Sequence, residues 1–545
     1  MARHGYKREW TLVAGIELVA LTCGFFMTLA SGQSAGPQVV TQYGRILGIY
    51  ADQAAIFYGV PYAADPVGNL RWQAPQEVTP WGSEVLNATS PRPACPQYDC
   101  QRLSPPLVCP KETSEACLHL DIYTPRAATL NTSYPVMVYI HGGNFVHMAS
   151  SSPLFDGRRL VTRDVIYVAI NYRLGALGFL VTGETSSDAQ GNYGILDQQM
   201  ALRWVQKNIG SFGGDPNQVT LFGQSAGAQS SLLHLTLPSS APLFQRIIIE
   251  SSPLAIPYKR FPEAILLGAL FAELVGCAPR DVPCLRSKST QDIVYAQYLA
   301  RSKVSSLKLL ELFEPWGPFV DGQLIEAEPL PMIQAGRFSS KEIMIGTTSE
   351  ETVLYIYSAW NASVGDVEYG EVVLATYPDH AVKIMYMYPP AYPRDERDTM
   401  VKLSTDLVFA CSTRNATRNI LKKMDSTYLY VWDHAFSFPG WGPIFFCEGR
   451  VCHGSEIVYL FQTQWQGNFT FTANEQVLSE QLQIYWTNFA KSGNPNQPTV
   501  QQLQWPKYSK DEDWPNLWFK TPSSAVDTDY HGPFCDFWDN VGYAA

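Results

Sequence analysis

Two copies of one pentapeptide, Gly-Gln-Ser-Ala-Gly, stand at 32–36 and 223–227. A G-x-S-x-G pattern exposes a nucleophilic serine when a strand precedes it and a helix follows it, because the sharp turn lifts the hydroxyl above the sheet. The second copy follows the apolar run 218–222 and opens a helical pattern, whereas the first copy has neither flank. The context therefore predicts Ser225 as a nucleophile. Ser34 is expected to belong to the segment that joins an N-terminal leader to the rest of the chain.

A serine hydroxyl is a weak nucleophile at neutral pH and needs a general base, usually a histidine that a carboxylate orients. In the chain order that accompanies this turn, the histidine lies downstream of the serine. The downstream histidines are His234, His380, His434, His453 and His531. We favour His453, because a Cys447–Cys452 disulfide would stiffen its loop and hold the base in position. His434, at the end of the strand-like run 426–432, is the second candidate.

The carboxylate that orients this histidine is expected just past the end of a strand, between the serine and the histidine. Glu350 and Glu351 closely follow the apolar run 341–345, and Asp321 and Asp406 are alternatives. The residues alone leave the choice among these four acids open.

A glycine pair stands where backbone N–H groups could stabilise the oxyanion that forms when a serine attacks a carbonyl. The segment Tyr-Ile-His-Gly-Gly-Asn-Phe at 139–145 follows an apolar run. Such a turn can aim successive N–H groups at one point, and the residue after the nucleophile supplies another donor. We therefore expect Gly143, Asn144 and Ala226 to form an oxyanion hole.

Apolar, β-branched runs alternate with helical patterns along the chain, and these elements must position the candidate residues. Runs typical of strands occupy 37–60, 134–140, 164–170, 218–222, 245–251, 341–347 and 426–432. Helical patterns occupy 192–209, 226–237 and 475–493. This alternation predicts an α/β fold with a central, mostly parallel sheet covered by helices on both faces. Because no linker-like segment interrupts it, we expect a single large domain.

The composition excludes several classes of protein. The 545 residues include 39 Lys and Arg against 50 Asp and Glu, which gives a net charge of −11. A chain without clustered cations is a poor binder of nucleic-acid phosphates. A hydrophobic content of 46% excludes a disordered chain. The mean hydropathy of −0.10 excludes a membrane protein with many spans.

The first 32 residues have the pattern of a secretory signal peptide, which places the remaining domain at 33–545. Basic residues precede an apolar stretch at 11–30, and small residues follow it. An uncleaved membrane anchor is the alternative. Of eleven cysteines, Cys23 lies in the leader, and the other ten suit disulfides in an oxidising compartment. The candidate glycan sites are the N-x-S/T sequons at Asn87, Asn131, Asn361, Asn415 and Asn468.

These motifs together resemble the type B carboxylesterase family, which includes the cholinesterases. The segments that carry the resemblance include FYGVPYAADPVGNLRWQAPQ at 57–76, EACLHLDIYTP at 115–125, HGGNF at 141–145, NYRLGALGF at 171–179, the stretch 191–230 around GQSAG, CHGSEI at 452–457 and YWTNFAKSGNPN at 485–496. The resemblance implies the α/β-hydrolase fold, with Ser225 as nucleophile, Glu351 as acid and His453 as base. It also implies the disulfides Cys95–Cys117, Cys277–Cys284 and Cys411–Cys535, which leaves Cys100–Cys109 and Cys447–Cys452 as local pairs.

Three positions depart from the pattern of this family. Asn144 stands where a third glycine is usual, Gln224 where glutamate commonly precedes the serine, and Thr352 where glycine often follows the acid. Cholinesterase-like members also place a tryptophan inside the first disulfide loop to bind a quaternary ammonium group. The stretch 95–117 contains no tryptophan. Together with the charge lost at Gln224, this disfavours choline esters as substrates.

The sequence thus predicts a secreted, glycosylated serine ester hydrolase that acts on small-molecule esters through an acyl-enzyme, with no metal or organic cofactor. We expect no nucleic-acid partner, and membrane attachment only through a retained leader; the oligomeric state is open. The alternatives are a non-catalytic adhesion or storage protein on the same fold, and a lipase or cholinesterase-like member with a narrower substrate range. In a lipase, the aromatic-rich stretch 313–319 could line an acyl pocket, although it could equally be core.

Overall fold

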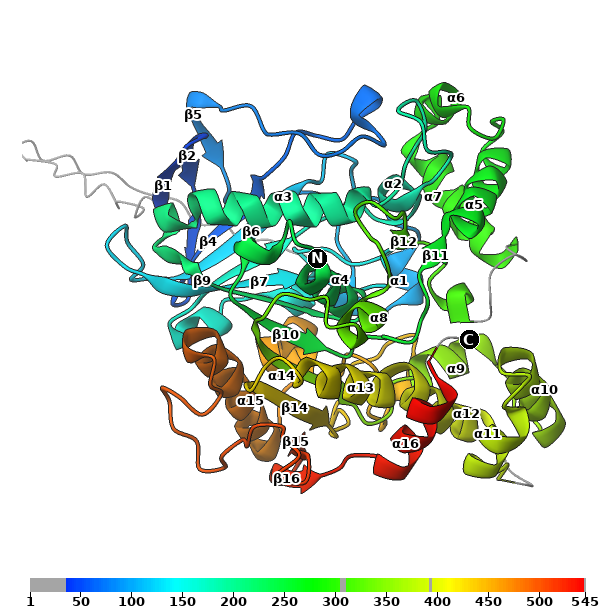
Figure 1. Cartoon of the computed structure of the whole chain (residues 1–545). Helices are drawn as coiled ribbons and strands as arrows, with labels where there is room; N and C mark the ends of the chain where they lie inside the picture. The colour runs from blue at the N-terminus through cyan, green and yellow to red at the C-terminus, as the bar shows by residue number, and fades with distance from the viewer. Residues whose placement is uncertain (1–35, 304–309, 392–394, 544–545) are drawn as a thin grey trace, which may run out of the picture. The chain divides into compact units, whose positions relative to one another are not determined.

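The computed structural model describes residues 36–303, 310–391 and 395–543 (Figure 1). The predicted leader, with Ser34 and Cys23, lies outside the described residues. Gly36–Ala545 forms one compact unit. In the described ranges, no helix combines the length and the apolar character needed to cross a membrane.

One large sheet organises the described residues. In spatial order its strands are β16 (Ala525–Thr528), β15 (Pro515–Phe519), β14 (Thr427–Trp432), β13 (Glu342–Thr348), β10 (Arg246–Glu250), β9 (Gly214–Gln224), β7 (Tyr134–Ile140), β8 (Ile166–Ile170), β6 (His119–Pro125), β4 (Ala54–Pro61) and β3 (Ile49–Ala51). From β15 to β8 every neighbouring pair is parallel. The pairs at both edges are antiparallel, so the predicted mostly parallel sheet is confirmed.

Two small sheets and the helices complete the fold. The small sheets contain β1 (Gln38–Thr41), β2 (Gly44–Leu47) and β5 (Gly82–Asn87), and β11 (Lys259–Arg260) with β12 (Phe319–Val320). The helices are α1 (Cys100–Leu103), α2 (Gly175–Phe179), α3 (Tyr193–Asn208), α4 (Ala226–Thr236), α5 (Phe261–Leu274), α6 (Val282–Ser287), α7 (Thr290–Lys303), α8 (Pro329–Gln334), α9 (Val353–Ala359), α10 (Asp366–Thr376), α11 (Ala381–Met387), α12 (Arg397–Thr405), α13 (Cys411–Ile420), α14 (Ile457–Phe461), α15 (Ala473–Ser492) and α16 (Gly532–Val541).

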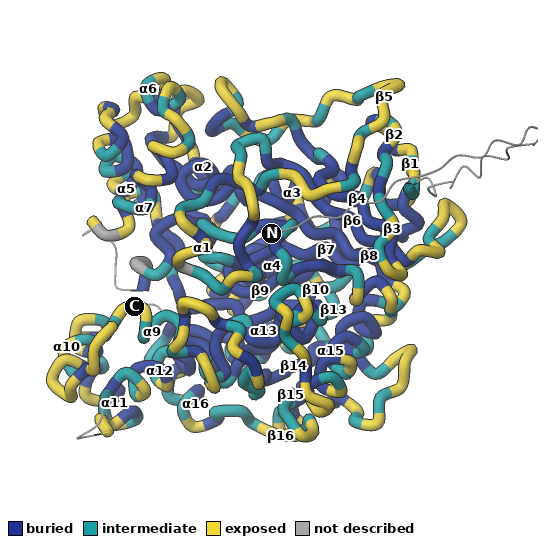
Figure 2. The backbone as a smooth tube through the Cα atoms, turned by 180° about the vertical axis from the view of Figure 1, so that it is seen from behind, coloured by how far each residue is buried: buried dark blue, intermediate teal, exposed yellow. Residues whose placement is uncertain are grey.

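Alternate residues of the central strands enter two separate cores, because successive side chains of a strand point to opposite faces of the sheet. In β7, Val136 and Val138 pack in one core with residues of α3 and α4. Met137 and Tyr139 pack in a second core with residues of α14 and α15. Helices therefore cover both faces of the sheet, as predicted, and Figure 2 shows its central strands as buried.

The elements predicted around the candidate residues are confirmed with small shifts of their ends. The strand predicted at 218–222 is longer, because β9 begins at Gly214 within the predicted loop. The late helix is α15, which begins with a capping box between Thr472 and Glu475. It ends at Gly493, which has a φ of 73° that suits glycine. The sequence did not separate α5 to α12, or predict β15 and β16.

The described residues contain five disulfides, and they join the pairs that the resemblance implied or left over. The bonds are Cys95–Cys117, Cys100–Cys109, Cys277–Cys284, Cys411–Cys535 and Cys447–Cys452. The longest covalent loop is closed by Cys411 in α13 and Cys535 in α16, which are 124 residues apart in sequence.

Removal of the Cys411–Cys535 bond should destabilise the protein more than removal of Cys277–Cys284, which spans only 7 residues. Loop-closure entropy predicts losses of about 5 and about 2 kcal/mol for the two cystine-to-serine pairs. Differential scanning calorimetry would compare the melting temperatures of the two double-serine variants, and the variant without Cys411–Cys535 should have the lower one. Equal melting temperatures would contradict the prediction.

Candidate active site

Ser225 stands at the sharp turn between β9 and α4. Its φ of 61° and ψ of −126° are a combination that residues other than glycine rarely adopt, so the surrounding packing must maintain it. Its N–H donates to the carbonyl oxygen of Glu250 at the end of β10 (2.9 Å). A Cβ atom at Gly227 would lie 1.9 Å from the carbonyl oxygen of Ile140, and one at Gly223 would lie 2.6 Å from it. The strand, turn and helix expected around the second pentapeptide are therefore present.

Beside this turn, a histidine and a carboxylate form a buried pair. Nδ1 of His453 lies 2.5 Å from Oε2 of Glu351. Glu351 is fully buried, and its second oxygen accepts a hydrogen bond from the N–H of Thr348 (2.7 Å). A carboxylate at Nδ1 keeps the proton on that nitrogen, which leaves Nε2 as the nitrogen that can accept one.

The neighbouring acid, Glu350, anchors the loop that carries this histidine. Its carboxylate pairs with Arg450 (2.7 Å) and accepts a hydrogen bond from the N–H of Val451 (2.9 Å). The Cys447–Cys452 disulfide closes the same loop. The two adjacent glutamates therefore have different partners, and only Glu351 reaches the imidazole.

Apart from His380, the other candidate histidines and acids form hydrogen bonds elsewhere. The partners are Gln198 and Ser240 for His234, Glu475 and Thr521 for His434, Asp406 for His531, and Asn192 for Asp321. Burial lowers the pKa of His234 to about 3, which suits a neutral packing residue. His380 precedes α11 and is half-buried. Among the described residues, none of these side chains shares a hydrogen bond with Ser225, His453 or Glu351.

The loop of His453 lies next to the turn that carries Ser225. The described residues show no hydrogen bond between these two side chains. Instead, the side-chain amide of Gln224 lies 3.1 Å from Nε2 of His453. Burial raises the pKa of Tyr355 well above its usual value, and a side-chain hydrogen bond with Ser225 opposes part of that rise. A direct contact between the serine hydroxyl and the imidazole therefore requires the Gln224 amide to move away.

The glycine-rich turn after β7 lies directly against the serine. A Cβ atom at Gly142 would lie 2.9 Å from Cβ of Ser225. Gly143 and Asn144 have φ angles of 95° and 52°, and asparagine tolerates this left-handed region. In the part of the chain that the structure describes, the N–H groups of Gly143, Asn144 and Ala226 have no protein acceptor. An oxyanion hole requires backbone donors that are free of a protein acceptor, and these three N–H groups meet that condition.

Two buried acids near the pair were missed by sequence reasoning. Burial raises the pKa of Glu250 to about 8, and a hydrogen bond from Trp486 (2.6 Å) opposes part of the rise. Burial, followed by the charges of Glu250 and Glu351, raises the pKa of Glu456 well above its usual value. In both acids, burial therefore disfavours the charged form. Their signal was an acid at the end of a buried run and an acid three residues after His453.

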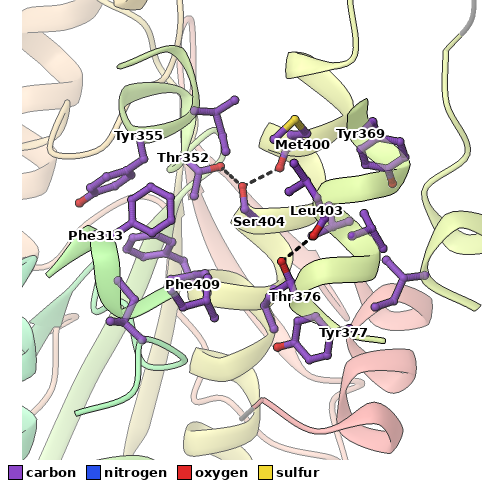
Figure 3. Close-up of a pocket in the computed structure, with 18 of the residues that line it drawn as sticks. Phe313, Thr352, Tyr355, Tyr369, Thr376, Tyr377, Met400, Leu403, Ser404 and Phe409 are labelled. Atoms are coloured by element: carbon purple, nitrogen blue, oxygen red, sulfur yellow. Dashed lines mark hydrogen bonds between the residues drawn. The ribbon is translucent and has the colours of Figure 1, made fainter. Parts of the chain in front are cut away.

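Figure 3 shows an apolar cavity of about 80 Å³, and two of the residues that line it also lie next to the imidazole of His453. Tyr355 and Phe409 line it, and their ring centroids lie 5.6 and 5.2 Å from that of His453. Further lining residues are Phe313, Ile356, Tyr369, Val373, Met400 and Leu403. Of the aromatic stretch 313–319, Phe313 therefore lines a cavity, whereas Trp316 belongs to a separate hydrophobic core.

The structure separates the five sequons into two groups. Asn87, Asn131, Asn361 and Asn468 are exposed. Asn415 lies within α13, and its side-chain amide donates a hydrogen bond to Asp539 (2.8 Å). The amide nitrogen of Asn415 is thus already engaged in a hydrogen bond at the surface.

Comparison with known proteins identifies the family of the chain. Residues 35–538 match the model of the carboxylesterase family. The chain is 38% identical to the cAMP-regulated D2 protein of Dictyostelium discoideum, over 93% of both chains. It is 35% identical to the Crystal protein of the same organism, over 93% of this chain and 91% of that protein, and 32% identical to the acetylcholinesterase of Bungarus fasciatus, over 93% and 87%. The chain therefore belongs to the carboxylesterase family and has its α/β-hydrolase fold.

Proposed function

We propose that this chain is a serine hydrolase of carboxylic esters that works through an acyl-enzyme. The observation that carries the proposal is the buried 2.5 Å contact between His453 and Glu351, beside the strained turn at Ser225. A histidine that a carboxylate orients, next to a turn of the kind that presents a serine, is the arrangement that activates a serine hydroxyl.

In the proposed mechanism, Oγ of Ser225 attacks the ester carbonyl while Nε2 of His453 takes the hydroxyl proton. Glu351 holds the proton on Nδ1 and stabilises the imidazolium that forms. The backbone N–H groups of Gly143, Asn144 and Ala226 stabilise the negative oxygen. His453 then returns the proton to the leaving alcohol, and water repeats the sequence on the acyl-enzyme.

Gln224 adds a step that a glutamate at this position would not. Its amide donates to Nε2 of His453, the nitrogen that must accept the proton of Ser225. One nitrogen lone pair cannot accept both donors, so the amide leaves before the first proton transfer. Substrate binding is therefore coupled to a movement of the Gln224 side chain.

The cavity beside His453 supports esters with an apolar group as substrates. It is lined by aromatic and aliphatic side chains that would bury such a group. The acetylcholinesterase relative raises choline esters as an alternative. The stretch 95–117 lacks a tryptophan for a quaternary ammonium group, and Gln224 carries no charge, so neutral esters are favoured.

We also propose that the chain is secreted and carries glycans at the four exposed sequons. Five disulfides among the described residues suit an oxidising compartment. Cleavage of a leader at 1–32 belongs to the same proposal.

A non-catalytic role on the same fold is the second candidate. Two observations favour it: the missing hydrogen bond between Ser225 and His453, and a relative at 35% identity whose name, Crystal protein, describes no activity. The two candidates differ in whether the serine can be activated.

Covalent labelling of the serine decides between them. A fluorophosphonate probe should label the purified chain at Ser225, and Ser225→Ala should lose the label and about 10⁶-fold in kcat while its circular dichroism is retained. Mass spectrometry of the labelled peptide identifies the site. Absence of label on the folded parent chain would favour the non-catalytic role.

The two adjacent glutamates provide a matched pair of variants. Glu351→Gln should lower kcat by about 10⁴-fold, because an amide no longer holds the proton on Nδ1 of His453. Glu350→Gln loses a partly exposed ion pair with Arg450 and should lower kcat by less than about tenfold. Steady-state kinetics with a nitrophenyl ester would compare them. A larger loss for Glu350→Gln would refute the assignment of Glu351.

The cavity predicts how activity depends on acyl length. Val373 in α10 lines the cavity, and the adjacent Leu374 is 55% exposed. Val373→Phe should fill the space and lower kcat/KM for a nitrophenyl octanoate by about 10- to 200-fold, with a much smaller effect on the acetate. Leu374→Phe, the control on the same helix, should change neither value. Equal effects of Val373→Phe on both esters would place the acyl chain elsewhere.

A further inference from the structure

A buried carboxyl that the proposed mechanism does not use lies one helical turn from the nucleophile. Glu314 is only 6% exposed, and its Oε2 accepts a hydrogen bond from the side-chain amide of Gln229 (3.0 Å). Gln229 is the fourth residue after Ser225 in α4, and its own N–H donates to the carbonyl oxygen of Ser225 (2.9 Å). Glu314 does not line the apolar cavity.

The charge of Glu314 affects the pKa of two tyrosines that lie beside the proposed site. After burial, which is the main cause, its charge contributes to the raised pKa of Tyr172 and of Tyr355. The hydroxyl of Tyr172 donates to the carbonyl oxygen of His141 in the glycine-rich turn (2.9 Å), and the ring centroid of Tyr355 lies 5.6 Å from that of His453. Glu314 therefore lies against the first turn of α4, and its charge acts on residues beside the glycine-rich turn and beside His453.

Three polar atoms at this place have no hydrogen-bond partner among the described residues. They are Oε1 of Glu314, Oε1 of Gln229 and the hydroxyl of Tyr258, and all three are buried. The charge of Glu314 also contributes to the raised pKa of Tyr258, again after burial, and Tyr258 is adjacent in the chain to Lys259, whose Nζ lies 3.1 Å from the carbonyl oxygen of Glu314. Buried polar atoms are nearly always paired, so three such atoms in one place indicate a polar ligand.

The charges already present indicate that this ligand group is neutral. Nζ of Lys259 donates to the carbonyl oxygen of Glu314 (3.1 Å) and supplies a cation to the same region. A second, ligand-borne cation would add an uncompensated buried charge, which is costly. Burial raises the pKa of Glu314 to about 7, so that both its protonated and its ionised forms are populated near neutral pH. A hydroxyl group can donate to the carboxylate or accept from the carboxylic acid, and thus suits both forms.

We propose that Glu314, Gln229 and Tyr258 form a polar subsite that binds a neutral hydroxyl group of the substrate. The substrate class is then a hydroxylated ester, either of a hydroxy acid or of a polyol. A hydroxyl at this place donates to Oε1 of Glu314 and accepts from the hydroxyl of Tyr258. The subsite deepens the proposed ester hydrolase function, because it selects among esters.

Binding to the full chain carrying Ser225→Ala tests the subsite without turnover. Isothermal titration calorimetry would compare methyl 3-hydroxybutyrate with methyl butyrate, and glycerol monobutyrate with propyl butyrate. At least one hydroxylated ester should bind about tenfold more tightly than its parent. The two pairs separate a hydroxyl on the acyl side from one on the alcohol side.

Substitutions in the subsite should remove this preference. With Glu314→Leu added, the hydroxylated and parent esters should bind equally. Tyr258→Phe, which removes only a hydroxyl, should reduce the preference severalfold and serves if the leucine variant does not fold. Glu326→Gln, at an exposed glutamate paired with Arg337, is the matched control and should keep the preference.

The subsite is refuted if neither hydroxylated ester binds more tightly than its parent, or if both subsite variants keep the preference. Because the Ser225→Ala protein does not turn over, this result is independent of whether the parent chain hydrolyses esters. An inactive parent chain with a hydroxyl preference would refute the hydrolase function and leave the subsite standing.

Discussion

The site depends on how closely α4 approaches the end of β7. With a hydrogen atom in place of a side chain at Gly223 and Gly227, the helix packs directly on the carbonyl oxygen of Ile140. This contact sets the position of Ser225 and Ala226 on one side, and of the glycine-rich turn after β7 on the other. A displacement of about 1 Å between reacting groups can cost about two orders of magnitude in rate. Any larger residue at these glycines would separate Ser225 from the backbone N–H groups that we propose as oxyanion donors.

The acids near the imidazole differ in their hydrogen-bond partners and in their burial. Glu351 pairs with His453. Glu350 pairs with Arg450, a partly exposed residue of the loop that carries His453. Among the described residues, neither Glu250 nor Glu456 forms an ion pair, and burial raises the pKa of both. Desolvation favours the neutral form of an acid and a nearby donor favours the charged form. Burial and the available partners thus distinguish these neighbouring carboxyl groups from one another.

The functional side chains come from the loops that follow the carboxyl ends of parallel strands. Ser225 follows β9, Glu351 follows β13 and His453 lies beyond β14, so the parallel pairing brings all three to one edge of the sheet. Open α/β sheets bind ligands at this edge. Beside it, the structure places an apolar cavity lined by Tyr355 and Phe409, and a polar group around Glu314. An ester with one apolar and one hydroxylated part would use both.

Much of the framework could be predicted from the sequence because local patterns specify it. The buried runs became β7, β9, β10, β13 and β14, and the helical pattern after the pentapeptide became α4. The turn at Ser225 was predictable because the glycines needed for close packing are adjacent to it in the chain. The same holds for the glycine-rich turn after β7.

The pairing of distant side chains was decided only by the tertiary structure. From the residues alone, Glu350 and Glu351 could not be told apart, and His434 competed with His453. The fold directs Glu351 to His453, binds His434 to Glu475, and brings the amide of Gln224 to the base. Glu314 gave no sequence signal at all. Periodicity specifies which face of a strand or helix is buried, whereas a contact across a hundred residues depends on where loops return to the sheet, and no local pattern carries that information.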